Sequence, residues 1–328
     1  MDESPVSPTV LGHFFQVDGK QLQQQYKHHL SDYSTWEQQE HAAEWMLFEQ
    51  NMGRSLSIDE TAFANGELYT IVTNKEAKGR KGSIVAMIKG TQADQLTEVL
   101  KRIPKRLRRM VEEVTLDTVA ASMNSTVQRC FPNAHRVIDR FHVQKLAFEA
   151  VQEIRIHHRW QALEEENVAM DQAKRTGHAY QPEILPNGDS VKQLLARSRY
   201  LLFKHPGAWT REQRQRAELL FTRYPVIHKG YQLSLRLGEV FRHCTSKEQA
   251  FKKLALWYND VEDAGLPSFK TLARTIQHHY LGILNFFNNR ATNASAESFN
   301  AKIKAFRNAM RGVRDVEFFL FRLSKIYA

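Results

Sequence analysis

Residues 55–88 read SLSIDETAFANGELYTIVTNKEAKGRKGSIVAMI, and this stretch decides the fold. It contains three short runs rich in β-branched and apolar residues, Ser55–Asp59, Glu67–Thr73 and Gly82–Ile88. Turn residues separate the runs, with Asn-Gly in the first gap and a Gly- and Lys-rich segment in the second. Because antiparallel strands can be joined by short turns, the stretch predicts a three-stranded antiparallel meander.

The residues that follow alternate between helix and strand patterns. Thr91–Arg102 and Ser122–Phe131 carry apolar residues at helical spacing, and each ends close to a proline. A short strand follows each helix, Val114–Asp117 and then Arg136–Asp139. A helix between two strands indicates a parallel crossover. We therefore predict an α/β fold of the RNase H-like type, with a five-strand mixed sheet, helices on both faces, and the first and fourth strands as neighbours.

Strand patterning almost vanishes after Asp139, and helical periodicity dominates the next 150 residues or so. This change predicts a chain in four parts. Residues 1–50 form an N-terminal helical preface, and residues 51–144 form the first part of the RNase H-like core. Residues 145–290 form a large all-α insertion before the last helix. Residues 291–328 return to the core as its C-terminal helices.

One late helix is expected in Thr292–Arg311, which reads TNASAESFNAKIKAFRNAMR. Its apolar residues recur on one stripe at helical spacing: Phe299, Ile303, Phe306 and Met310. Asn293 or Ser295 can cap this helix, which places Glu297 in or near the first turn. A carboxylate is favoured there by the helix dipole.

Three carboxylates stand where they could converge. Asp59 and Asp117 each end an apolar strand, and Glu297 opens the late helix. Two divalent cations held by a few carboxylates can support an in-line displacement at phosphorus, so these three predict phosphodiester chemistry. Asp139, which also ends a strand, remains the alternative for the second position. Glu60 points to the opposite strand face from Asp59 and is interpreted as a surface charge.

His142 lies three residues after Asp139 and invites a reading as a metal ligand or general base. Because it stands alone between Phe141 and Val143, we interpret it as structural. Four basic residues follow Glu297 on or near the late helix and are candidates for DNA binding. They are Lys302, Lys304, Arg307 and Arg311. Such side chains contact phosphates and carry no sequence information.

Composition favours a nucleic-acid partner. Lys and Arg number 46 against 36 Asp and Glu, which gives a net charge of +10 and a pI of about 9.5. Two cysteines, Cys130 and Cys244, exclude a disulfide framework and leave no Cys-x-x-Cys zinc pattern. The start lacks a basic segment followed by an apolar one, and no run approaches the ~18 apolar residues of a membrane span. We therefore expect a cytoplasmic protein without a membrane partner.

The motifs resemble those of DDE transposases of bacterial insertion sequences, most closely the ISL-three family. The likeness is carried by residues 57–60 (SIDE), by Leu116-Asp117 with residues 131–145 (FPNAHRVIDRFHVQK), and by residues 293–304 (NASAESFNAKIK). The resemblance implies an RNase H-like catalytic domain with an α-helical insertion. It further implies dependence on Mg²⁺ or Mn²⁺, with the carboxylates of residues 59, 117 and 297 as the catalytic and metal-binding triad.

The same resemblance implies that DNA at element ends and at the target is the substrate, bound by a homo-oligomer. Relatives begin with a Cys-rich zinc-binding segment and a helix-turn-helix that read the element ends, and residues 1–50 show neither. We therefore expect a separate DNA-reading partner protein. Two alternatives stay open: an RNase H-like nuclease or resolvase that only hydrolyses DNA, and a non-catalytic DNA-binding remnant of a transposase.

Overall fold

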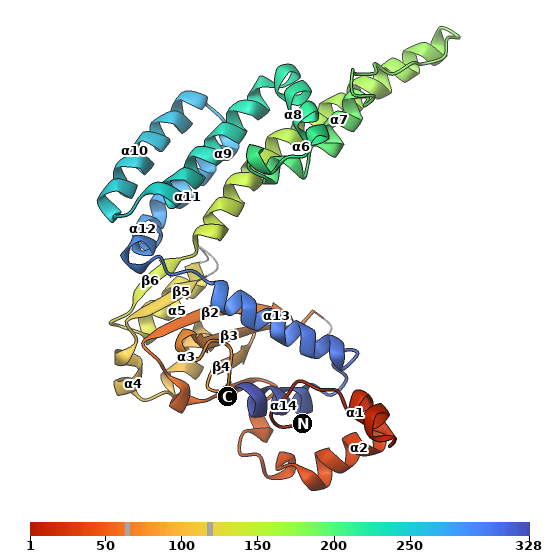
Figure 1. The fold of residues 1–328 in the computed structure, drawn as a ribbon. Helices are drawn as coiled ribbons and strands as arrows, with labels where there is room; N and C mark the ends of the chain where they lie inside the picture. The colour runs from red at the N-terminus through yellow and green to blue at the C-terminus, as the bar shows by residue number, and fades with distance from the viewer. Residues whose placement is uncertain (63–65, 117–120) are drawn as a thin grey trace. The chain divides into compact units, whose positions relative to one another are not determined.

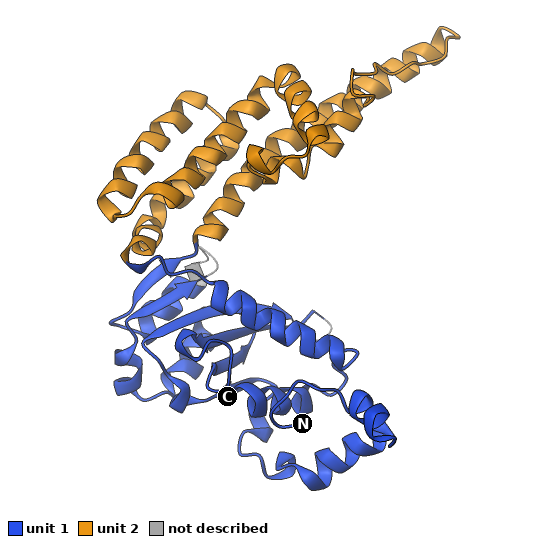
Figure 2. Ribbon diagram, viewed as in Figure 1, with its two compact units in different colours: residues 1–139, 289–328 blue, residues 140–288 orange. Residues whose placement is uncertain are grey.

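The computed structural model describes residues 1–62, 66–116 and 121–328. These residues divide into two compact units (Figure 2). Unit 1 comprises Met1–Asp139 and Asn289–Ala328, and unit 2 comprises Arg140–Asn288. Unit 1 is therefore discontinuous in sequence, because the chain leaves it after Asp139 and returns at Asn289.

Unit 1 has an α/β fold with one mixed sheet of parallel and antiparallel strands, in the order β1-β4-β3-β2-β5-β6. Strands β2 to β6 are labelled in Figure 1. In the described residues the strands are β1 (Trp45–Leu47), β2 (Ser55–Ala62), β3 (Leu68–Asn74), β4 (Ile84–Lys89), β5 (Glu113–Leu116) and β6 (His135–Ile138). Strands β2, β3 and β4 pair antiparallel, as the short turns of the meander require. Strand β5 pairs parallel with both β2 and β6, so the first and fourth strands predicted from the sequence are neighbours.

The sheet has six strands in the described residues, and the prediction of five is therefore wrong. The additional strand is β1, a three-residue edge strand that pairs antiparallel with β4. It lies within residues 1–50, where only helices were expected. The Gln38 side chain stabilises the end of this strand, because it accepts a hydrogen bond from Leu47 N–H and donates one to Leu47 O. So short a strand leaves almost no alternation in the sequence, which is why the pattern missed it.

Both faces of the sheet are covered, because successive strand residues alternate between two apolar cores. One core joins Ile58 of β2 to helices α3 (Ala93–Lys101) and α5 (Ala121–Cys130). The other joins Ile71 of β3 to helices α13 (Ala294–Ala309) and α14 (Val316–Tyr327). Phe299, Ile303 and Phe306 of α13 are buried in this second core, as the apolar stripe predicted. Burial of side chains of this size stabilises the fold by ~1.5–3 kcal/mol each.

Besides a π-helix at Tyr26–Leu30 and short 3₁₀ turns, the described residues of unit 1 contain three further α-helices. They are α1 (Pro8–Phe15), α2 (Gly19–Gln25) and α4 (Lys105–Met110). Ser7 caps α1 by accepting a hydrogen bond from Val10 N–H, and Asp18 caps α2 through Gln21 N–H.

The described elements of unit 2 are helices, apart from one isolated bridge between Ile184 and Ser190. The helices are α6 (Arg140–Arg175), α7 (Val191–Arg197), α8 (Arg211–Arg223), α9 (Pro225–His243), α10 (Lys247–Ala264), α11 (Pro267–His278) and α12 (Tyr280–Asn289), of which the final residue counts with unit 1. Capping boxes at Ser190 and Thr210 begin α7 and α8. Among the described residues, no helix is long and apolar enough to cross a membrane.

Candidate active site

Asp59 and Asp139 lie where the parallel pairing of three strands ends. Ile58 of β2 pairs with Leu116 of β5, and Leu116 pairs in turn with Ile138 of β6. Asp59 and Asp139 are the next residues on the two outer strands of this trio. Strand β2 itself continues to Ala62, but beyond Ile58 it pairs only with β3. The register therefore brings these two aspartates to one edge of the parallel part of the sheet.

Asp117, predicted as the second carboxylate, lies outside the described residues, which stop at Leu116 on β5 and resume at Ala121 in α5. The described end of β5 belongs to the same edge of the sheet, because the Asp139 N–H donates a 3.0 Å hydrogen bond to Leu116 O.

The Asp59 carboxylate is held from two sides. Its Oδ1 accepts a 2.8 Å hydrogen bond from the Glu60 N–H, and its Oδ2 accepts one from Asn300 Nδ2. Asn300 is buried on α13, and it reaches Asp59 because Ile58 occupies the opposite face of β2. Desolvation raises the pKa of the neighbouring Glu60 carboxyl, and the negative charge of Asp59 raises it further. A cation bound at Asp59 would relieve that repulsion.

Asp139 is fully buried and anchors the start of α13. Its Oδ2 accepts a 2.8 Å hydrogen bond from the N–H of Asn293, the residue before the helix. The Glu297 N–H then donates to Asn293 O at 3.0 Å, which places Glu297 in the first turn. A carboxylate at this end of the helix is also favoured by the helix dipole. Helix α13 is thus bound to both aspartates, through Asn293 to Asp139 and through Asn300 to Asp59.

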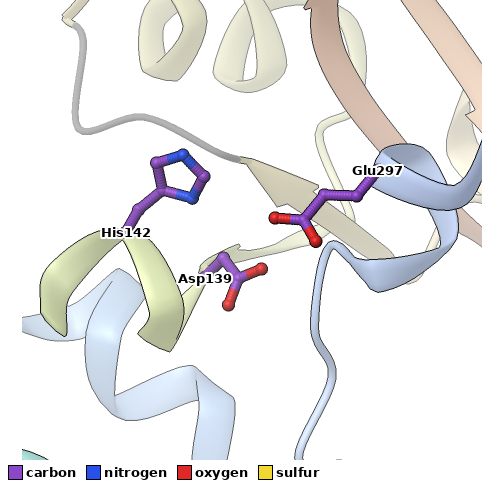
Figure 3. Close-up of side chains that lie close together, drawn as sticks. All are labelled: Asp139, His142 and Glu297. Carbon is purple, nitrogen blue, oxygen red and sulfur yellow. The ribbon is translucent and has the colours of Figure 1, made fainter. Parts of the chain in front are cut away.

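Asp139, His142 and Glu297 point toward one another (Figure 3), and their ligand atoms lie within 4.8 Å of one another. His142 lies in the first turn of α6, three residues after Asp139 along the chain. Carboxylate oxygens suit Mg²⁺ and Mn²⁺, so two carboxylates in this arrangement fit such a cation. The interpretation of His142 as a purely structural residue overlooked this proximity, since spacing alone does not place Glu297 beside it.

The family model of the ISL-three transposases matches residues 56–323. The chain belongs to this family. The match spans both β2, with Asp59, and α13, with Glu297, and it confirms the resemblance seen in the motifs.

This ISL-three chain is also similar to the transposase for insertion sequence element IS1001 of Bordetella parapertussis. The two are 23% identical over 272 residues, which cover 82% of this chain and 59% of that relative. The chain thus spans less than two thirds of the relative's length. No solved structure matches the chain.

The four basic candidates after Glu297 fall into two groups. Lys302 donates a 2.7 Å hydrogen bond to the O atom of Gly79, a turn residue, and Arg307 donates a 3.1 Å bond to the O atom of Ala62, the last residue of β2. Lys304 and Arg311 are exposed. The exposed pair is therefore better placed for phosphate contacts than the pair that binds backbone carbonyls.

Sequence reasoning missed a buried polar cluster at the start of β5. Lys75 Nζ donates to Glu113 Oε1 at 2.8 Å and to Thr115 Oγ1 at 3.0 Å, and Asn289 Nδ2 donates to Glu113 Oε2 at 2.6 Å. Lys75 begins the Lys- and Arg-rich segment 75–81, whose composition is typical of a solvent-exposed surface. No local sequence pattern indicates that its side chain is buried. Asn289 is where the chain re-enters unit 1, so Glu113 anchors the segment that leads to α13.

Proposed function

We propose that this chain is the catalytic part of a transposase that cuts DNA at insertion-sequence ends and joins them to a target. We assign the sheet to the RNase H-like type and unit 2 to a helical insertion in that domain, near the predicted bounds of 145–290. The observation that carries the proposal is the docking of α13, with Glu297 in its first turn, on Asp59 and Asp139, which follow the last parallel-paired residues of β2 and β6.

In this proposal Asp59, Asp117 and Glu297 hold two Mg²⁺ or Mn²⁺ ions. Bound in this way, the ions would lower the pKa of an attacking water or DNA 3′-hydroxyl and stabilise the leaving oxygen. Asn300 orients Asp59 through its hydrogen bond to Oδ2. Asp139 fixes the start of α13, because its buried Oδ2 already accepts the Asn293 N–H. We assign Asp139 this positioning role, and because its carboxylate also lies close to that of Glu297, it remains the alternative to Asp117 as the second ligand.

Alanine replacements test this assignment. Asp59→Ala, Asp117→Ala and Glu297→Ala should each reduce metal-dependent cleavage of an element-end duplex on the order of a thousandfold or more, since each removes a ligand of one functional unit. Glu60→Ala is the matched control, because it removes a carboxylate adjacent to Asp59 and should retain activity. If Asp117→Ala stays active while Asp139→Ala is inactive, the second ligand is Asp139.

A strand-transfer assay with a pre-cut DNA end separates the two enzymatic readings. A transposase joins the 3′-hydroxyl of that end to a target duplex, whereas a nuclease or resolvase only hydrolyses. Wild-type protein that forms joined product supports the transposase. Metal-dependent cutting without joining assigns the hydrolytic function, and the absence of both reactions in the intact protein assigns the DNA-binding remnant.

We further propose that the chain works in the cytoplasm as a homo-oligomer on DNA and obtains its end specificity from a separate DNA-reading protein. Lys304 and Arg311 offer phosphate contacts, which are indifferent to sequence. Alone, the chain should bind with steep salt dependence at ~10⁻⁴–10⁻⁶ M near physiological salt. A titration against an element end and a scrambled duplex measures this. Preference for the true end by about a thousandfold, as specific binders achieve, would contradict it.

A further inference from the structure

Unit 2 contains a half-open cavity of about 300 Å³ between α6 and α9. Phe141 and Phe148 line it from α6, two helical turns apart, and Leu235 and Arg242 line it from α9 with the same spacing. Gly238 stands between the latter two and keeps the hollow open. A Cβ atom at that position would meet Gln144 Oε1 at 2.7 Å.

The rim of the cavity is basic. Arg140, His205 and Arg242 contribute to the lining, which includes no acidic residue among those the structure describes. The guanidinium of Arg140 lies 4.7 Å from the ring centroid of Phe141 and 5.5 Å from that of Phe286. Its buried Nε has no hydrogen-bond acceptor in the described part of the chain. An arginine in this state is available to an anionic ligand.

We propose that this cavity holds one unstacked nucleobase of bound DNA, with an adjacent phosphate at Arg140 or Arg242. Ligand pockets run from ~300 to 1,000 Å³, so this cavity suits a single small ring system. Aromatic side chains such as Phe141 and Phe148 stack on any base, and arginine adds cation–π and phosphate contacts. A base reaches such a pocket only after it leaves the duplex stack. This inference rests on the proposed function as a DNA-cutting transposase. It adds that unit 2 binds one unstacked base of the DNA.

The experiment uses the full chain in EDTA, where no cleavage occurs, and two labelled duplexes of one sequence. One duplex is fully paired, and the other carries a single unpaired thymine. Wild-type protein should bind the second about 5-fold to 160-fold more tightly, the range that one base stacked on an aromatic side chain supplies. Phe148→Ala removes a stacking face and Leu235→Trp fills the cavity, so both should bring the ratio of affinities close to one. Phe251→Ala, an exposed aromatic on α10 outside the cavity, should leave it unchanged.

A measurement on unaltered protein covers the case in which a variant does not fold, as judged by circular dichroism. A 2-aminopurine placed at the unpaired position should change its emission on binding as its stacking changes. Unchanged emission, equal affinity for the two duplexes, or a preference that survives both folded cavity variants would overturn the proposal. Because no divalent metal is present, the result is independent of the cleavage assays. If the protein shows no preference for the duplex with the unpaired base, the proposed carboxylate site is unaffected. If the alanine variants show that the carboxylates are not catalytic, the binding preference can still be measured.

Discussion

Asn300 links the Asp59 carboxylate to the helix that carries Glu297, three residues and just under one turn away. Partners that orient metal ligands usually contribute ~10–100-fold to metal affinity or activity. We therefore expect Asn300→Ala to lower cleavage by about that factor and to raise the Mn²⁺ concentration needed for half-maximal activity. The Mn²⁺-dependent rise in the thermal unfolding midpoint should shrink in parallel, and it provides a readout that does not depend on catalysis.

Asn308→Ala is the matched control, because Asn308 is exposed near the other end of the same helix. An Asn300→Ala protein with wild-type Mn²⁺ dependence would show that its hydrogen bond to Asp59 is only structural. The sequence could predict that Asp59 belongs to a strand and that Glu297 lies in the first turn of a helix, since strand alternation and helix capping are local patterns. It could not predict the hydrogen bond from Asn300 to Asp59, because the two residues lie 241 positions apart and only the packing of α13 on β2 joins them.

At the scale of elements, the start of β5 depends on the pair between Lys75 and Glu113, which are joined at 2.8 Å with side chains 17% and 10% exposed. Removal of one partner from a buried ion pair typically costs ~3–5 kcal/mol, because the other charge is left unpaired. Since Asn289 still donates to Glu113, we expect Lys75→Met to lower the free energy of unfolding by about 3 kcal/mol, the lower end of that range. Urea denaturation of the full chain measures the change.

The nearby pair of Arg54 and Glu112 is the comparison, with a 3.1 Å separation and side chains 70% and 64% exposed. Exposed pairs contribute ~0–1 kcal/mol, so Arg54→Ala should change the unfolding free energy by no more than that. Equal effects of Lys75→Met and Arg54→Ala would mean that the buried cluster does not stabilise β5.

The elements differ in how far their sequences reveal them. Strands β2 to β6 were predictable, because each carries β-branched residues bounded by turn or helix signals. Strand β1 was not, since Trp45–Leu47 is too short to show alternation and depends on pairing with β4 and on Gln38. The identity of the proposed second metal-binding carboxylate could not be predicted from the sequence either. Asp117 and Asp139 each follow a short apolar run in the sequence, and this local pattern is the same for both.

At the scale of the whole molecule, unit 1 consists of two segments separated in sequence by unit 2, which raises the question of whether unit 1 folds without unit 2. The chain leaves this unit after Asp139 and re-enters it at Asn289. The two crossing points are close within unit 1 itself, because the N–H of Asn293, four residues after the return, donates to the Asp139 carboxylate at 2.8 Å. A short linker can therefore bridge them, and the entropy of closing such a loop grows only slowly with its length.

We expect a chain in which a Gly–Ser linker replaces residues 140–288 to fold into the sheet with its two covering layers. Both apolar cores, one on α3 and α5 and the other on α13 and α14, are built entirely from residues that this change retains. The measurement is cooperative thermal unfolding followed by far-ultraviolet circular dichroism, with strand signal in the native baseline. In the same shortened chain Asp139→Leu should lower the unfolding midpoint, since it leaves the Asn293 N–H without its acceptor. A shortened chain without a cooperative transition would mean that unit 1 depends on unit 2 for its stability, because every apolar contact of its own cores is still present.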